Sequence, residues 1–154
     1  MSTPMIPSTI IQPYLFFGGR CDEALDFYRS ALGATIDIVM RFKDSPDPLP
    51  PGMLQPGFEN KVMHTCFRVG NNAIMASDGC KEGSNFSGFS LSLSVQTEAE
   101  ANRVFALLAE GGQIQMPLCK TFWSPRFGML TDRFGVAWMV LTLPQEPYRG
   151  ESLA

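Results

Sequence analysis

Twice along the chain, apolar positions change from strand-like alternation to helical spacing and then back to alternation. The first occurrence covers residues 9–36 and the second covers residues 87–114. A period of two is typical of a strand with one buried face, whereas spacings of three and four residues are typical of an amphipathic helix. Each segment therefore predicts a strand, a helix and a second strand.

The ends of both predicted helices carry the expected signals. The first helix follows Gly19, has acidic residues in its first turn, and stops at Gly33, where a left-handed cap is favourable. The second begins with Thr97 and Glu100, the spacing of a capping box, and stops at the pair Gly111-Gly112. Both helices are therefore predicted to span about three turns.

Further alternating segments predict two more strands after each strand-helix-strand unit. They cover Lys61–Val69 and Ala73–Asp78, and then Phe127–Thr131 and Val136–Leu143. Between Lys43 and Asn60 the chain contains five prolines, which donate no backbone hydrogen bond, so this segment is predicted to be a loop.

The two halves match at one offset of 78 residues without a gap. The matched pairs are Asp22 with Glu100, Phe27 with Phe105, Ala31 with Ala109, Gly33 with Gly111 and Ile36 with Ile114. This pattern predicts an α+β fold in which a βαβββ module occurs twice. We expect one domain over residues 1–154, with modules at about 8–79 and 86–143 and a polar tail over 144–154.

Strand alternation also predicts which side chains share a face. Phe89, Leu91, Leu93 and Val95 form an apolar row that should face the helix, and Ser90, Ser92 and Ser94 form the opposite row. By the repeat offset, Gln12, Tyr14 and Phe16 belong to the same face as the serines. Such a face is either exposed to solvent or lines a cavity with polar positions, and we favour the cavity.

Composition narrows the class of protein. The formal net charge is −3 and the isoelectric point is about 5.1, which argues against a nucleic-acid partner. No apolar run is long enough to span a membrane, and the N-terminal residues lack the features of a secretory signal. The four cysteines are far apart and form no CxxC pair, so we expect free thiols and a cytoplasmic protein.

The chain resembles the vicinal oxygen chelate superfamily, which includes glyoxalase I, extradiol dioxygenases, and bleomycin- and fosfomycin-resistance proteins. Within it, the chain is most similar to the PhnB-like group, often labelled a 3-demethylubiquinone-9 3-methyltransferase domain. The resemblance rests on PYLFFGGRCDEALDFYRSALGA, AIMASD, SGFSLSLSV and TFWSPRFGMLTDRFGVAWMV. It implies paired βαβββ modules that form a U-shaped mixed sheet around a cavity, and usually a homodimer.

The resemblance also implies where a divalent metal would bind. Metal-using members take His or Gln from the first strand of each module and Glu from the last. In this chain the matching positions are Gln12, Ser90, Met75 and Met139. Only Gln12 suits such an ion, because Ser90 is a poor ligand for it and the thioethers of Met75 and Met139 provide no anionic oxygen. The resemblance therefore leaves open whether a divalent metal is a cofactor. If such an ion binds, Gln12 and His64 are the expected ligands.

His64 is the only histidine and the one candidate catalytic residue. Imidazole titrates near neutral pH, so it could act as a ligand or general base, and the alternative is a partly buried histidine bonded to backbone. Trp123 and Phe127 flank a Ser-Pro-Arg turn and could line a pocket, although core packing explains most of the aromatic residues. The full set of expected cavity residues is Gln12, Tyr14, His64, Met75, Ser77, Ser90, Ser92, Trp123, Phe127 and Met139.

These observations favour a protein that binds a small molecule in the cavity. The alternative is a metal-dependent lyase, isomerase or thiol transferase of the glyoxalase type. A methyltransferase is less favoured, because no glycine-rich turn joins a strand to a helix in the way a nucleotide-type methyl donor requires. A purely structural dimerising module would bind no ligand.

Overall fold

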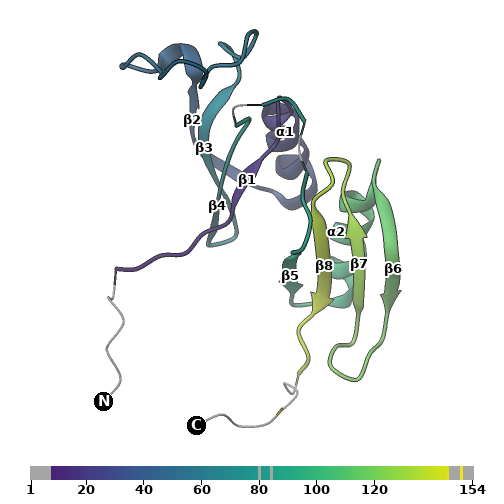
Figure 1. Cartoon of the computed structure of the whole chain (residues 1–154). Coiled ribbons are helices and arrows are strands. Elements are labelled where there is room, and N and C mark those ends of the chain that lie inside the picture. Colours follow the sequence, from purple (N-terminus) through teal and green to yellow (C-terminus); the bar gives the residue numbers. More distant parts are fainter. Residues whose placement is uncertain (1–7, 80, 84, 146–149, 151–154) are drawn as a thin grey trace. The chain divides into compact units, whose positions relative to one another are not determined.

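The computed structural model describes residues 8–79, 81–83, 85–145 and 150. The chain divides into two compact units, which are Met1–Gly83 and Ser84–Ala154. Each contains one helix and four strands in the same order along the chain (Figure 1). The first unit comprises β1 (Tyr14–Phe16), α1 (Cys21–Leu32), β2 (Thr35–Arg41), a 3-10 turn η1 (Phe42–Asp44), β3 (Val62–Val69) and β4 (Asn72–Ser77). The second comprises β5 (Leu91–Val95), α2 (Glu98–Ala109), β6 (Gln113–Cys119), β7 (Phe127–Thr131) and β8 (Ala137–Thr142).

Each unit forms one open, mixed sheet of four strands. The order is β1-β4-β3-β2 in the first sheet and β5-β8-β7-β6 in the second. In both, the first strand pairs in parallel with the last, and the other pairs are antiparallel. The predicted fold class of paired βαβββ modules is therefore confirmed. The cavity between the modules stays a prediction.

The repeat extends to the register of individual residues. A bulge interrupts the β2–β3 ladder between Ile36 and Ile38, and the β6–β7 ladder has one between Ile114 and Met116. These positions are 78 residues apart, as predicted. Met75 and Met139 are 64 residues apart and occupy equivalent places opposite Tyr14 and Ser92. The offset changes because segment 42–61 of the first unit is longer than segment 120–126 of the second.

The helix ends follow the sequence signals. Gly33 adopts φ 66° and caps α1, and the Thr97 hydroxyl accepts the Glu100 backbone N–H at 3.1 Å to cap α2. The N-terminus of α1 has no cap from its own segment. Its Cys21 N–H is bound instead by Asp78, which follows β4.

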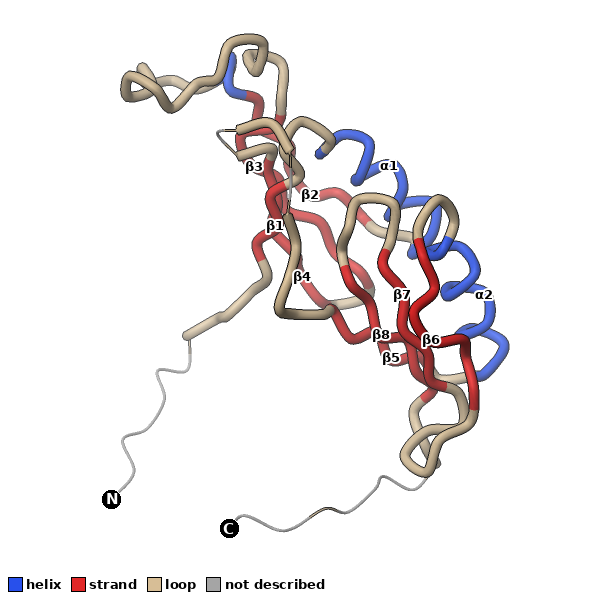
Figure 2. The backbone as a smooth tube through the Cα atoms, turned by 45° about the vertical axis from the view of Figure 1, so that its right-hand side comes forward, coloured by secondary structure: helices blue, strands red, loops and turns tan. Residues whose placement is uncertain are grey.

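One helix covers one face of each sheet (Figure 2). In the first unit Tyr28 of α1 stacks on Phe67 of β3, with ring centroids 5.8 Å apart. In the second unit the apolar stripe of α2, including Phe105 and Leu108, is buried, as are Leu130 and Val140 on the sheet. The alternating burial along β7 and β8 shows that the opposite face of this sheet is only half-buried.

The first strand of each unit is shorter than predicted. Residues 9–13 precede β1, and residues 87–90 precede β5. Pro13 lacks an amide hydrogen and cannot donate to a ladder, whereas its carbonyl accepts the Met75 N–H at 2.9 Å. Leu91 and Leu93 pair with the buried residues Trp138 and Val140, so they face the helix as expected, but Phe89 lies outside the strand and is exposed.

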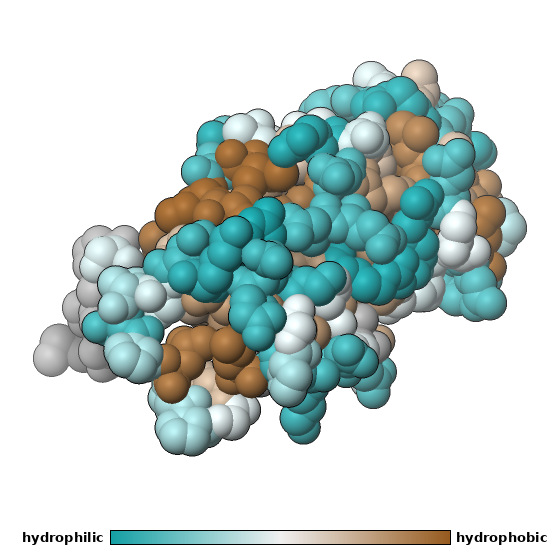
Figure 3. Space-filling view, turned by 90° about the horizontal axis from the view of Figure 1, so that it is seen from above, coloured by the Kyte–Doolittle hydropathy of each residue, from teal (hydrophilic) through white to brown (hydrophobic). Residues whose placement is uncertain are grey.

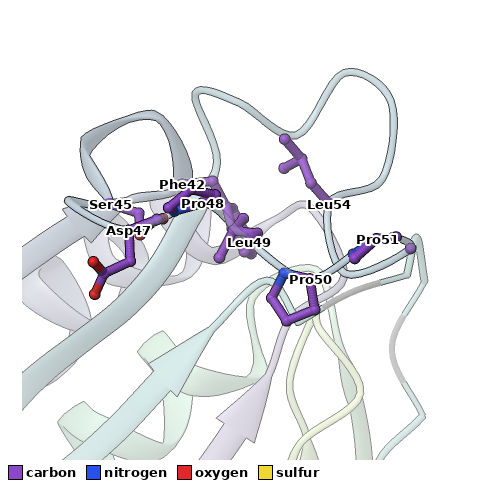
Figure 4. Close-up of a pocket in the computed structure, with 9 residues that line it drawn as sticks. Phe42, Ser45, Asp47, Pro48, Leu49, Pro50, Pro51 and Leu54 are labelled. Atoms are coloured by element: carbon purple, nitrogen blue, oxygen red, sulfur yellow. Dashed lines mark hydrogen bonds between the residues drawn. The ribbon is translucent and has the colours of Figure 1, made fainter.

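The proline-rich segment is a loop, as predicted, apart from the short η1 turn. Residues between Phe42 and Leu54, most of them apolar but including Ser45 and Asp47, line a surface pocket of about 360 Å³ (Figure 4). Cys80 and most of the predicted tail lie outside the described residues. Over the described part of the chain, no helix combines the length and apolarity needed to cross a bilayer.

Candidate ligand-binding face

The face of the first sheet that points away from α1 carries most of the predicted site of the first unit. Leu15, Phe67 and Ala76 are buried against the helix, so their neighbours along each strand face the other way. We name this side the open face. It consists of Tyr14, Phe16, Ile38, Met40, His64, Cys66 and Met75.

Tyr14 and His64 form the polar centre of the open face. The Tyr14 hydroxyl lies 3.2 Å from His64 Nδ1, and the two rings are 5.7 Å apart. Phe16 packs beside Tyr14, with centroids 5.0 Å apart. Tyr14 is 36% exposed and Phe16 is 56% exposed, so a bound molecule could reach both rings. The arrangement offers an aromatic surface and a held imidazole that can donate or accept a hydrogen bond.

The remaining predicted residues of the first unit have different surroundings. Gln12 lies before β1 and is half-buried, and Met75 is directly opposite Tyr14. Ser77 is buried, and its hydroxyl accepts the Gly79 N–H at 3.1 Å. The Ser77 hydroxyl therefore takes part in the turn that follows β4.

Asp78 is a structural anchor. Its carboxylate is 1% exposed and accepts three backbone N–H groups at 2.8 Å, from Gly19, Cys21 and Val62. The negative charge also lies at the N-terminus of α1, where the helix dipole favours it. Sequence reasoning missed this role, because the oxygens of Asp78 join α1 to β3 through backbone groups distant from it in the chain.

In the second unit the equivalent sheet face carries Ser92, Phe127 and Met139. Ser90 lies before β5 and is exposed. The structure thus brings together Tyr14, His64 and Met75 in one unit, and Ser92 and Met139 in the other. One cavity shared by all ten predicted residues stays a prediction.

Trp123 lies outside the strands, on a surface pocket of about 380 Å³ that it shares with Phe122. The Trp123 ring meets Phe122 and Phe127 edge-on, with centroids 4.7 and 5.4 Å apart. By contrast, Phe134 and Trp138 are core residues. Apolar side chains reach the surface at several places, and the view in Figure 3 shows such patches between polar ones.

The donor set does not fit the divalent metal that the superfamily resemblance implies. Met75 and Met139 stand where carboxylates are expected, and Ser92 lies opposite Met139. Hard and borderline divalent ions prefer carboxylate and imidazole ligands over thioethers. Among the described residues, no group of three His, Cys, Asp or Glu side chains comes together. We therefore derive no reaction step through such an ion.

Cys66 and Met40 belong to the open face but were absent from the predicted site. Cys66 lies opposite Met75, and Met40 lies opposite His64. The signal that could have found Cys66 was its position two residues after His64 on one strand, which places both side chains on one face. The position of Met40 opposite His64 could not be predicted in this way, because a bulge shifts the β2–β3 register.

Cys21 and Cys66 should differ strongly in reactivity. Burial raises the pKa of the Cys21 thiol far above its usual range, and the nearby Asp78 and Asp22 charges raise it further. Cys66 is half-exposed. We expect a thiol reagent to modify Cys66 in the native protein and Cys21 at least about 100-fold more slowly, because Cys21 reacts only after local opening. Peptide mapping by mass spectrometry measures both rates, and equal rates would contradict the buried position of Cys21.

Comparison with known proteins places the chain in a family. A family model described as 3-demethylubiquinone-9 3-methyltransferase matches residues 9–141. The chain is 37% identical to protein YjdN of Escherichia coli over 145 residues, which is 89% of this chain and 97% of that protein. It belongs to the PhnB-like group of the vicinal oxygen chelate superfamily. The family description contains the name of a methyltransferase, but a name by itself establishes no activity.

Solved structures agree with this family. Protein PA1353 from Pseudomonas aeruginosa is 46% identical, with a TM-score of 0.76 and coverage of 88% of this chain and 98% of that one. A PhnB protein from Bacillus cereus is 32% identical, with a TM-score of 0.70 and coverage of 87% and 99%. The fosfomycin resistance protein FosX from Listeria monocytogenes is 11% identical, with a TM-score of 0.63 and coverage of 92% and 97%, and shows a shared fold alone.

Proposed function

We propose that this protein binds a small molecule against the open face of its first sheet, with Tyr14 and His64 as the main polar contacts. The observation that carries this proposal is the Tyr14–His64 contact of 3.2 Å on a half-exposed face of rings and sulfur-bearing side chains. Binding sites typically combine an apolar lining with a few convergent polar groups. The open face offers both.

The side chains favour a planar or apolar ligand with at least one hydrogen-bonding group. Tyr14 and Phe16 provide ring surfaces for stacking, and half-buried methionine side chains adapt to irregular shapes. His64 could donate to or accept from the ligand, while Gln12, at the start of the same face, would add an amide. Arg68, at the far end of β3, is paired with Asp37 at 2.9 Å and lowers the pKa of that carboxyl through its hydrogen bonds, so its charge is already compensated.

We further propose a cytoplasmic homodimer, as the superfamily resemblance implies. The thiols of Cys21, Cys66 and Cys119 are free, in keeping with a reducing compartment. Size-exclusion chromatography with light scattering measures the mass directly, and a monomeric mass across the micromolar range would contradict the dimer.

A metal-dependent lyase, isomerase or thiol transferase is the alternative. One FosX structure is a complex with Mn(II) and 1S,2S-dihydroxypropylphosphonic acid. Calorimetric titration of this protein with Mn(II) tests that alternative, and saturable binding of one ion per chain would favour it over simple ligand binding. A methyltransferase has less support, because each sheet contains only one parallel strand pair and neither is a doubly wound nucleotide-type sheet.

The test of ligand binding uses the fluorescent aromatic anion 8-anilinonaphthalene-1-sulfonate as a probe. We expect a variant with Gln12→Ala and His64→Ala to bind the probe about 10- to 30-fold more weakly, because each lost hydrogen bond contributes about 1 kcal/mol. The thermal midpoint should change little, since both residues are partly exposed. Fluorescence titration and circular dichroism measure the two quantities.

Ser90→Ala is the matched control, because Ser90 lies 78 residues after Gln12, at the equivalent position before the first strand of the second unit. His64 also provides a direct readout, since the only imidazole of the chain gives a single set of ring signals in nuclear magnetic resonance. Unchanged probe affinity in the double variant, or ring signals that do not shift when the probe binds, would refute the proposed site.

A further inference from the structure

Four side chains with soft donor atoms lie together on the open face of the first sheet. His64 and Cys66 are two residues apart on β3 and therefore share a face. Met75 on β4 is directly opposite Cys66, and Met40 on β2 is directly opposite His64. All four are half-buried, so they are neither locked in the core nor fully hydrated. The cluster offers one thiol, one imidazole and two thioethers.

The register allows these donors to meet at one point. Side chains directly opposite each other on paired strands have Cβ atoms about 4.5–5.5 Å apart. The flexible thioether arms of Met40 and Met75 can lean toward the centre, where the shorter Cys66 side chain stands. The register therefore places three sulfur-bearing side chains and one imidazole at neighbouring positions of one sheet face.

The contact between His64 and Tyr14 is the kind of support that a metal-binding histidine needs. His64 Nδ1 lies 3.2 Å from the Tyr14 hydroxyl oxygen, which can accept a proton from Nδ1–H and leave the Nε2 lone pair for an ion. Ligating histidines typically donate their other ring N–H to an oxygen acceptor that fixes the tautomer and the ring orientation. Tyr14 would have this role.

We propose that Met40, His64, Cys66 and Met75 bind one cuprous ion. Thiolate and thioether ligands select Cu(I), whereas Mg²⁺, Ca²⁺ and Mn²⁺ prefer oxygen ligands. On binding, the Cys66 thiol releases one proton to solvent, so the thiolate and the monovalent ion are together neutral. Met75 occupies a position where a carboxylate ligand for a divalent ion is expected. Its thioether suits the softer cuprous ion better than a divalent one.

The second unit provides an internal comparison. At the equivalent places on its open sheet face, Met129 is opposite Met139 and replaces Cys66, while Phe127 replaces His64. This face also carries a thiol, because Cys119 is directly opposite Phe127, but it has no imidazole. Of the two faces, the one in the first unit combines a thiol with an imidazole, so we place the cuprous site there and expect one ion per chain; the Cys119→Ser variant tests whether the second face contributes.

The experiment titrates the reduced protein with Cu(I) under anaerobic conditions in competition with bathocuproine disulfonate. We expect each chain to withhold one Cu(I) ion from the chelator. Cys66→Ser should weaken binding at least about 100-fold and Met75→Leu about tenfold, because loss of a direct ligand costs at least as much as loss of a supporting partner. Cys119→Ser and Met139→Leu are matched controls, a half-exposed cysteine and the equivalent methionine of the second unit, and should bind as the parent does.

Two outcomes would overturn the proposal. Either Cys66→Ser retains the parent affinity, or Cys119→Ser loses as much affinity as Cys66→Ser. X-ray absorption of the copper-loaded parent protein gives a result independent of any variant, and a first shell of oxygen and nitrogen alone would also overturn it. Met75→Leu conserves volume, so its fold should persist if Cys66→Ser misfolds.

The cuprous site shares His64 with the proposed ligand site but does not depend on it. Gln12 belongs to the ligand site but not to the copper ligands, so Gln12→Ala should weaken binding of 8-anilinonaphthalene-1-sulfonate and leave the affinity for Cu(I) unchanged. Failure of copper binding with normal probe binding refutes only the metal proposal, and the reverse pattern refutes only the ligand proposal.

Discussion

Asp78→Ala is expected to lower the free energy of unfolding by about 3–5 kcal/mol, a large part of the stability of a domain of this size. The substitution removes the acceptor of three short hydrogen bonds, from the backbone N–H groups of Gly19, Cys21 and Val62. Each buried donor left without a partner costs about 1–3 kcal/mol, although water entering the space reduces the sum. Urea denaturation followed by circular dichroism measures the change.

Asp78→Asn is the matched control because it conserves size. An amide oxygen can still accept the two N–H groups that now share Oδ1, but its NH₂ group then faces the Val62 N–H. We expect a loss of about 1–3 kcal/mol, between the parent and the alanine variant. A loss below about 1 kcal/mol for Asp78→Ala would show that the carboxylate does not anchor α1.

The elements of the fold could be predicted from the sequence because local chemistry determines them. The stripe of α1 and the glycine after it are local signals, and the structure has the helix at Cys21–Leu32 with Gly33 as its cap. The strand predicted over Phe127–Thr131 has the same bounds in the structure, because its alternation is also a local signal. The first strands were predicted too long, because alternation continues through residues 9–13 although Pro13 cannot donate to a ladder.

The candidate site was less predictable because it depends on contacts between distant segments. The Tyr14–His64 pair joins residues 50 positions apart, and β4 lies between their strands in the sheet. Strand alternation together with the repeat offset placed Tyr14 on the face that points away from the helix, but neither gave the register that brings it to His64. The role of Asp78 was hidden in the same way, because Asp-Gly is typical of a turn while its partners lie far away in sequence.

The second unit has an anchor of its own in Asp132, and its loss is expected to cost about 2–4 kcal/mol. Asp132 is 3% exposed. Its Oδ1 accepts the N–H groups of Phe134 and Val136 at 2.9 and 3.0 Å. Its Oδ2 accepts the indole N–H of Trp138 at 2.9 Å, so the carboxylate fixes both the β7–β8 turn and a core side chain. Asp132→Ala leaves these buried donors facing a small apolar group.

Because one partner of Asp132 is a side chain, a double-mutant cycle can separate the indole contact from the turn. In Asp132→Asn, the amide NH₂ group must face either the backbone N–H groups of the turn or the indole N–H of Trp138, and all of these are donors. The orientation that keeps the hydrogen bonds of the turn points the NH₂ group at the indole. Trp138→Phe removes that donor. We therefore expect Asp132→Asn to cost about 1 kcal/mol less when Trp138→Phe is also present. Equal costs in both backgrounds, measured by urea denaturation with circular dichroism, would show that the indole bond contributes nothing and that Asp132 acts on the turn alone.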